Sequence, residues 1–136
     1  MINILFWNIR GVGNPTSRRR LKRIINKSNV SIVAIQEPMT DSQKINKLVH
    51  YLNFSNAVSN CNGKIWILWN HNWNVQLVGD SEQILSLSIS TDHLHSKHLF
   101  SCVYAKCNYI ERRPLWDEII HLSSAGYESW VIGGGF

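Results

Sequence analysis

The chain has 136 residues, of which 44% are hydrophobic and 17% are charged, a composition typical of a folded globular domain. Six Trp, four Tyr and four Phe exclude a disordered chain, and no apolar run is long enough to span a membrane. The three cysteines form no C-x-x-C pair, which favours neither a disulfide framework nor a zinc site and indicates a reduced, intracellular protein.

The net charge of +5 is unevenly distributed along the chain. Residues 1–36 contain seven basic side chains and no acidic one, whereas the remaining 100 residues contain seven basic and nine acidic side chains. A basic block of this kind indicates a polyanionic partner, because neutralising phosphates releases counterions. A solvated helix face is the alternative interpretation of the same block.

The first half of the chain predicts alternating strands and helices. The expected strands cover residues 2–7 and 30–37, and the expected helices cover residues 16–28 and 41–52. Both helices carry an apolar stripe at i, i+3 and i+4. Thr16 or Ser17 would cap the first helix, and Asp41 or Ser42 the second. This βαβα order predicts parallel neighbours in the first sheet.

The second half predicts an antiparallel meander followed by a helix and a last strand. The expected meander strands cover residues 64–70, 73–80, 83–91 and 98–105, the helix 112–124, and the last strand 129–134. In the third meander strand Leu85, Leu87 and Ile89 alternate with serines, and Pro114 lies in the first turn of the helix. The predicted architecture is mixed α/β, with helices on at least one face of a sheet.

Three polar residues follow or end predicted strands, where open α/β sheets bind ligands. Asn8 ends the first strand, Glu37 ends the second, and Tyr104 closes the last strand of the meander. Two oxygen-bearing side chains at consecutive strand ends suit a hard cation such as Mg²⁺. A turn-forming role for Asn8 and a cap or salt-bridge role for Glu37 remain as alternatives.

Other motifs allow rival interpretations. The turn at residues 10–17 resembles a dinucleotide-binding loop, but Thr16 stands in place of its third glycine. His93, His95 and His98 have a spacing that a metal could use, although a solvated hairpin turn explains them better. Cys102 and Cys107 are interpreted as core and loop residues, and the six Trp mostly as core, with Trp69 and Trp73 as candidates for a rim.

Four short motifs occur in a fixed order: FWNIRG, IVAIQE, VYAKCNYIERRPLWDEI and WVIGG. With them the chain resembles the N-terminal endonuclease domain of a plant LINE-type non-LTR retrotransposon, and the resemblance runs essentially from Met1 to Phe136. That domain belongs to the endonuclease/exonuclease/phosphatase superfamily, whose deoxyribonuclease I-like fold is a four-layer α/β sandwich. The resemblance implies a Mg²⁺- or Mn²⁺-dependent endonuclease with DNA as its partner, located in the nucleus or cytoplasm.

The resemblance also implies roles for individual residues. Asn8 corresponds to the asparagine that positions phosphate and metal, Glu37 to the metal-binding glutamate, and Tyr104 to the tyrosine that closes on the scissile phosphate. The family continues its last strand as GGDFN, whereas this chain has Gly135 at the position of the catalytic Asp. The basic segment is expected near the DNA only at its start, around Arg10.

The same resemblance predicts a partial domain, residues 1–136, that is cut before the second half of the fold and its Ser-Asp-His motif. We therefore expect the chain to be inactive, because several members of one catalytic group would be missing together. An apolar sheet face left uncovered would favour self-association. The alternative function is a non-catalytic, nucleic-acid-binding remnant that uses the basic N-terminal block.

Overall fold

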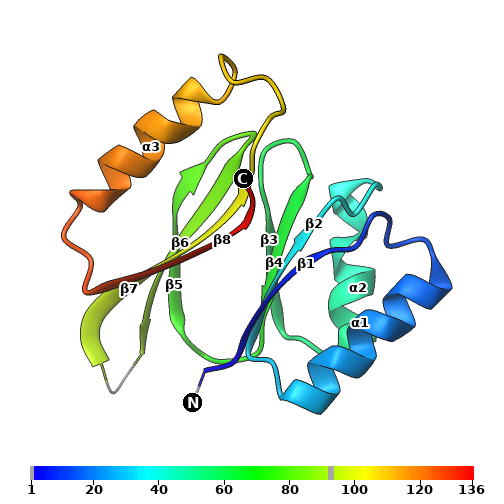
Figure 1. Cartoon of the computed structure of the whole chain (residues 1–136). Helices are drawn as coiled ribbons and strands as arrows, with labels where there is room; N and C mark the ends of the chain where they lie inside the picture. Colours follow the sequence, from blue (N-terminus) through cyan, green and yellow to red (C-terminus); the bar gives the residue numbers. More distant parts are fainter. Residues whose placement is uncertain (1, 92–93) are drawn as a thin grey trace. The chain divides into compact units, whose positions relative to one another are not determined.

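The computed structural model describes residues 2–91 and 94–136. The chain divides into two compact units, Met1–His71 and Asn72–Phe136, and each unit contains one four-stranded sheet (Figure 1). Because each unit has its own sheet, helices and core cluster, the two are described in turn.

The first unit is built on a sheet with the strand order β1-β2-β4-β3, and both of its α-helices lie on one face (Figure 1). Its elements are β1 (Ile4–Asn8), α1 (Pro15–Ser28), β2 (Ile32–Gln36), the 3₁₀ turn η1 (Ser42–Lys44), α2 (Ile45–Leu52), β3 (Asn56–Ser59) and β4 (Ile65–Trp69). β1 and β2 are parallel, which confirms the expectation from the βαβ order. β4 runs antiparallel to β2 and to β3.

The core of the first unit lies between the sheet and the two helices. Its buried members include Leu21 and Ile25 from α1, Leu48 and Leu52 from α2, and the strand residues Val33, Ile35, Trp66 and Leu68. Every residue of β2 and β4 is buried. Strands buried on both faces show continuous apolar runs, which is the pattern seen in both of these segments.

Asparagines define both ends of α1. Asn14 accepts hydrogen bonds from the N–H groups of Thr16 and Ser17 at 2.9 and 3.3 Å. The predicted cap at Thr16 or Ser17 is therefore wrong, because Pro15 takes the first helical position, where no N–H is needed. At the other end Asn29 adopts the left-handed conformation, with φ of 50°.

Asp41 forms a cap at the start of the second helical segment. Its Oδ1 accepts a hydrogen bond from the Gln43 N–H at 2.9 Å. This bond caps the 3₁₀ turn η1, and α2 continues from it at Ile45. The expected capping role of Asp41 is confirmed, with a 3₁₀ turn as the first turn of the predicted helix.

The second unit is built on a sheet with the strand order β5-β6-β7-β8. Its elements are β5 (Asn74–Asp80), β6 (Ile84–Thr91), β7 (Leu94–Tyr104), α3 (Arg113–Ser123) and β8 (Ser129–Gly135). β5, β6 and β7 form an antiparallel meander, and α3 joins β7 to its parallel neighbour β8. Leu115 and Leu122 of α3 pack on the strand residues Ile84, Leu99 and Val103.

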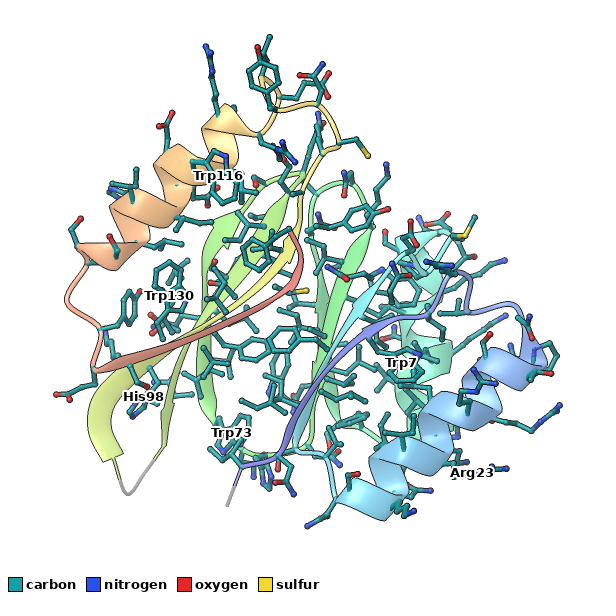
Figure 2. All side chains as sticks on the ribbon, viewed as in Figure 1. Trp7, Arg23, Trp73, His98, Trp116 and Trp130 are labelled. Carbon is teal, nitrogen blue, oxygen red and sulfur yellow. The ribbon has the colours of Figure 1, made fainter. Side chains whose placement is uncertain are left out.

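Both faces of β6 are buried. Leu85 is fully buried, as the predicted alternation requires. Ser86, on the opposite face of the strand, is fully buried as well. α3 covers that face, since Ile84 belongs to the cluster beneath the helix. Ser86 and Ser101 pair through their hydroxyls at 2.7 Å, and the Trp130 indole N–H donates to Ser101 Oγ at 3.0 Å (Figure 2). The buried hydroxyls are thus satisfied by one another.

The structure corrects the predicted four-stranded meander. The meander is right for β5, β6 and β7 but wrong for β4, which pairs with β2 and β3 in the first sheet. The apolar run of β4 is buried along its whole length between β2 and β3 of the first sheet. β3 is not predicted from the sequence, because Asn56–Ser59 is short and only half buried.

The last strand lies at the edge of its sheet and is more exposed than the sequence Trp130-Val131-Ile132 predicts. Val131 is 40% exposed, and only Trp130 and Ile132 are packed against the core cluster of the second unit. Beyond the strand, Phe136 stacks on Trp116 of α3 with ring centroids 6.5 Å apart.

None of the three cysteines forms a disulfide bond. Cys61, between β3 and β4, and Cys107, between β7 and α3, are exposed. Cys102 is buried in β7, and burial raises the pKa of its thiol to about 12. The interpretation of Cys102 as a core residue and of Cys107 as a loop residue is confirmed. Among the described residues, no helix has both the length and the apolar character to cross a membrane.

Candidate functional site

In the first unit, the register of β1 and β2 brings two of the predicted site residues to neighbouring strand ends. Asn8, at the end of β1, is paired with Gln36, at the end of β2, and Glu37 follows Gln36 directly. Both follow the carboxyl ends of parallel strands, the place where open α/β sheets bind ligands. Asn8 is exposed and Glu37 is partly exposed.

Backbone hydrogen bonds continue past the strands and fix these two ends together. The N–H of Gly11 donates to the Glu37 carbonyl at 2.8 Å, and the N–H of Val12 donates to the Pro38 carbonyl at 2.9 Å. The Glu37 N–H itself donates to the Lys64 carbonyl at 3.1 Å. The chain on either side of Glu37 is therefore tied both to the β1–α1 loop and to the residue that precedes β4.

Three non-glycine residues in this region have positive φ angles that an L-residue adopts only at a cost. The φ is 51° at Arg10, 54° at Glu37 and 55° at Met39. Such strain is of the order of 1–3 kcal/mol per residue and concentrates at binding and catalytic sites. The observed backbone thus supports a special role for the strand ends that the sequence singled out.

Asn8 lines a polar cavity of about 460 Å³ at the start of α1. The other lining residues are Trp7, Ile9, Arg10, Asn14, Ser17 and Arg20. Two guanidinium groups therefore share a cavity with Asn8. Arg10 was expected near the DNA, whereas no DNA contact was expected of Arg20. One feature of the sequence did indicate its position: Arg20 follows Ser17 by three residues and so lies on the same face of the helix.

The donor types of Asn8 and Glu37 fit a magnesium or manganese ion. An amide oxygen and a carboxylate at adjacent strand ends provide the one or two protein oxygens that Mg²⁺ takes while it keeps several waters. Within the described part of the chain, no group of three or more His, Cys, Asp or Glu side chains forms a site that protein ligands alone would complete. Asn8 and Glu37 by themselves would leave most coordination positions of such an ion to water.

The second unit brings the other two predicted residues together. Tyr104 and Gly135 are paired in the parallel register of β7 and β8, at the carboxyl ends of both strands. The N–H of Ala105 donates to the Gly135 carbonyl at 2.8 Å, which extends the pairing by one residue. The glycine at the position of the family aspartate thus lies beside the predicted tyrosine.

The φ angles of the two neighbouring glycines differ. Gly134 has a φ of 120°, a conformation that other residues rarely adopt, whereas Gly135 does not have a positive φ. The φ angle at position 135 therefore does not itself require a glycine.

Gln83 holds the segment that follows Tyr104, a role that the sequence did not indicate. The Gln83 side chain is only 6% exposed. Its Oε1 accepts from the Lys106 N–H at 2.9 Å, its Nε2 donates to the Glu111 carbonyl at 2.8 Å, and its own carbonyl accepts from the Tyr104 N–H at 2.8 Å. One buried amide therefore fixes both ends of the loop between β7 and α3.

The rival motifs are now accounted for in part. His93 lies outside the described residues, and the His98 ring nitrogen Nδ1 lies 2.7 Å from the Ser129 hydroxyl between β7 and β8 (Figure 2). Trp69 is only 9% exposed, so it belongs to the core, while Trp73 is partly exposed. The dinucleotide-binding interpretation fails on topology, since only β1 and β2 of the first sheet are parallel.

No known family model matches the chain, and no curated protein is similar to it in sequence. Solved structures are similar to it in fold. The endonuclease domain of TRAS1, a telomere-specific non-LTR retrotransposon, is 14% identical with a TM-score of 0.69; the alignment covers 98% of this chain and 58% of that one. An endonuclease/exonuclease/phosphatase family protein from Bacteroides thetaiotaomicron is 10% identical with a TM-score of 0.70, covering 99% and 61%.

A third similar structure is D. rerio TDP2 complexed with a single-strand DNA product, which is 11% identical with a TM-score of 0.70, covering 98% of this chain and 59% of that one. The chain thus spans about three fifths of the length of these proteins. At this level of identity the comparisons establish the fold: the chain has the mixed α/β, deoxyribonuclease I-like architecture predicted from its sequence.

Proposed function

We propose that this chain is the N-terminal part of a metal-dependent phosphodiesterase domain that acts on DNA, derived from a plant LINE-type non-LTR retrotransposon. The observation that carries the proposal is the register that places Asn8 and Glu37 at the carboxyl ends of adjacent parallel strands. The likeness of the fold to that of the TRAS1 endonuclease domain, and to TDP2 with a DNA product, supports the choice of DNA.

In this proposal each residue of the first unit has a distinct task. Glu37 and Asn8 would hold Mg²⁺ or Mn²⁺, which polarises a phosphate and stabilises the charge on the leaving oxygen. Arg10 and Arg20, which line the cavity beside Asn8, would bind the phosphate oxygens. The strained φ of Glu37 keeps the carboxylate at the strand end.

We further propose that the chain as given does not hydrolyse DNA at a useful rate. In the second unit, Gly135 is paired with Tyr104 at the strand ends and has no carboxylate to position a water. Loss of one positioned acid or base lowers a rate by about 10²- to 10⁴-fold. Residues 1–136 would form only part of the domain, since the chain spans about three fifths of the length of the similar structures.

Metal binding tests the proposed site independently of activity. Mn²⁺ added to ¹⁵N-labelled protein should broaden the amide resonances around Asn8 and Glu37, and Glu37→Gln should abolish the effect. Glu128→Gln, at an exposed position just before β8, is the matched control and should leave the broadening unchanged. Broadening centred elsewhere, or insensitive to Glu37→Gln, would contradict the proposal.

A plasmid-nicking assay with Mg²⁺ tests the proposed inactivity. The expected result is no nicking above the background of the Glu37→Gln variant. Nicking that requires Mg²⁺ and is lost in Glu37→Gln would instead support the enzyme class and refute the inactivity.

A binding function without catalysis is the second candidate, and the basic α1 favours it. Arg18, Arg19, Arg20, Lys22, Arg23 and Lys27 all lie on this one helix. DNA binding that depends on salt but not on Mg²⁺ or Glu37 would favour this candidate. Self-association through an uncovered apolar sheet face is proposed as well, and sedimentation velocity over a range of concentrations would test it.

A further inference from the structure

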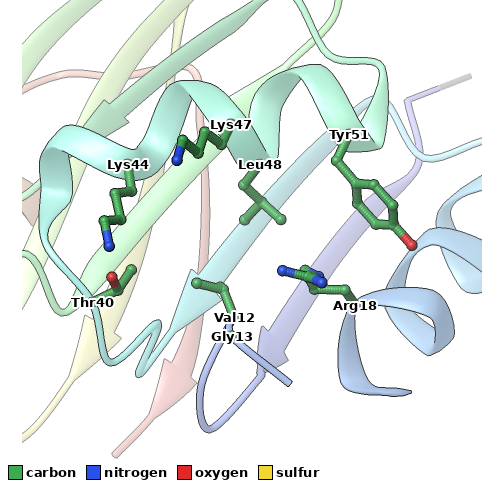
Figure 3. A pocket seen from close by; sticks show the side chains of 8 residues that line it. All are labelled: Val12, Gly13, Arg18, Thr40, Lys44, Lys47, Leu48 and Tyr51. Atoms are coloured by element: carbon green, nitrogen blue, oxygen red, sulfur yellow. The ribbon is translucent and has the colours of Figure 1, made fainter. Parts of the chain in front are cut away.

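A second cavity of about 440 Å³ lies in the first unit, between α1 and the start of α2 (Figure 3). It is lined by Val12, Gly13, Arg18, Thr40, Lys44, Lys47, Leu48 and Tyr51. None of these residues lines the cavity that contains Asn8. The two cavities are therefore separate features of the same unit.

Three cations from three elements line this second cavity, which we call the α1–α2 cavity. Arg18 comes from α1, Lys44 ends η1, and Lys47 belongs to α2 (Figure 3). No carboxylate is among the lining residues. In the portion of the chain with described contacts, none of these three side chains forms an ion pair. Their mutual repulsion is uncompensated within the unit, which favours an anionic ligand.

Tyr51 contacts two cations of α1 at the cavity, Arg18 and Lys22. The Lys22 ammonium lies 4.5 Å from the centre of the Tyr51 ring, and the Arg18 guanidinium lies 5.7 Å from it. Cation–π contacts of this kind contribute about 0.5–1 kcal/mol at exposed sites. They restrict two long side chains before any ligand arrives, and such preorganisation lowers the entropic cost of binding.

The backbone that borders the α1–α2 cavity is also fixed. The Val12 N–H donates to the Pro38 carbonyl at 2.9 Å, which joins the β1–α1 loop to the loop after β2. The nearest acid in sequence, Asp41, accepts the hydrogen bond of the Gln43 N–H and so serves as a helix cap. The lining cations therefore surround a preformed space with a hydroxyl donor, Thr40, at its edge.

We propose that the α1–α2 cavity binds backbone phosphates of a single-stranded nucleic acid. A strand is favoured over a small phosphate compound because the cavity is open and Lys22, which lies over the Tyr51 ring beside Arg18, continues the row of cations beyond it. Binding here needs neither a metal nor hydrolysis, so the inference does not depend on the proposed metal site; it narrows the second candidate function, binding through α1, to one site. Arg18 and the two lysines act as phosphate contacts, and Tyr51 positions Arg18.

The test compares two triple variants with the same loss of charge. Arg18→Gln, Lys44→Gln and Lys47→Gln remove the cavity cations. Arg19→Gln, Arg23→Gln and Lys27→Gln remove three exposed cations of α1 that line neither cavity. Fluorescence anisotropy with a labelled 20-nucleotide oligo-dT in EDTA measures affinity at several salt concentrations.

The cavity variant should bind at least about tenfold more weakly at 50 mM salt, with a log–log salt slope flatter by about two, since each lost phosphate contact changes the slope by about 0.7. The control variant should retain the slope of the parent chain. Equal losses in both variants, or no loss in the cavity variant, would overturn the proposal.

Three further arms separate the alternatives. Tyr51→Leu should weaken oligonucleotide binding whereas Tyr51→Phe, which keeps the ring, should not; loss in both would refute the positioning role. All binding is measured in EDTA, where no metal ion is bound, so failure of the metal site and failure of this cavity are distinguishable. Competition by millimolar inorganic phosphate equal to that by unlabelled oligo-dT, or binding to phosphatidylserine vesicles without binding to oligo-dT, would overturn the assignment to a nucleic acid strand.

Discussion

The two sheets share a pattern of strand directions but differ in what stands at the end of their parallel pairs. In each, an edge strand runs parallel to its neighbour, two antiparallel strands follow, and a helix joins the parallel pair: α1 in the first unit and α3 in the second. The first pair ends in Asn8 and Glu37, and the second in Tyr104 and Gly135. The helical connection therefore determines which strand ends lie side by side, and the residues at those ends determine what chemistry is available there.

The units also differ in how well their strands are covered. The edge strands differ most: β1 and β3 of the first sheet are half-buried along nearly their whole length, whereas β5 and β8 of the second contain more exposed than half-buried residues. Burial of apolar area is the main source of stability. The comparison leads us to expect the first unit to be the more sensitive of the two to core substitutions.

The largest expected effect comes from the helix cores. Leu21→Ala in α1 removes a fully buried side chain and should lower the free energy of unfolding by about 2–5 kcal/mol. Ile120→Ala in α3, where the side chain is 66% exposed, is the control and should cost less than about 0.5 kcal/mol. Urea denaturation monitored by circular dichroism measures both, and similar losses would refute the difference between the helices.

Gln83 should give the next largest effect. Gln83→Leu removes the acceptor of the Lys106 N–H and the donor to the Glu111 carbonyl, and a buried polar group left without a partner costs about 1–3 kcal/mol. Hydrogen exchange should show faster exchange at Lys106 than in the parent chain. Unchanged protection there would mean that the loop between β7 and α3 is held by other contacts.

The paired glycines should respond differently to aspartate. Gly134→Asp forces a residue with a Cβ into a φ of 120° and should cost more than about 1 kcal/mol. Gly135→Asp, at the position of the family aspartate, should change thermal stability little. If Gly135→Asp destabilised the chain as strongly as Gly134→Asp, the glycine at 135 would have a structural reason.

Glu118 should contribute a small dependence of stability on pH. Burial raises the pKa of this carboxyl, a hydrogen bond from Ser81 opposes the shift, and nearby Asp80 adds to it. A folded-state pKa above the unfolded one means that the folded state holds more protons, so stability falls as the pH rises above the usual glutamate value of about 4.3. Between pH 4 and 7 the free energy of unfolding of the Glu118→Gln variant should depend less on pH than that of the parent chain. The exposed control Glu128→Gln should not have this effect.

Much of this fold could be predicted from periodicity, because local patterns and tertiary cover agree. The strands at residues 30–37, 83–91 and 98–105, and the helices that carry Leu21 and Leu115, lie where the apolar patterns place them. The exception is β4. It pairs with β2 and β3 of the first sheet, and this choice of partners depends on the whole chain and not on a local pattern. β3 has too short and too polar a sequence to stand out.

The candidate site was predictable only in part, for a related reason. Strand ends can be found from sequence, so Asn8, Glu37 and Tyr104 could be placed at them. Arg20 and Gln83 could not, because their roles depend on what a helix start or a distant loop presents to them. The α1–α2 cavity could not be predicted either, because its cations are far apart in the sequence: Arg18 and Lys44 are 26 positions apart.

The three thiols make the chain ready for spectroscopic labelling without any added cysteine. One exposed thiol lies in each unit, Cys61 in the first and Cys107 in the second, while Cys102 is buried and its high pKa keeps it protonated. Maleimide dyes should therefore attach at two positions in the native protein. Energy transfer between a donor on one and an acceptor on the other would report the separation of the units directly, with and without DNA.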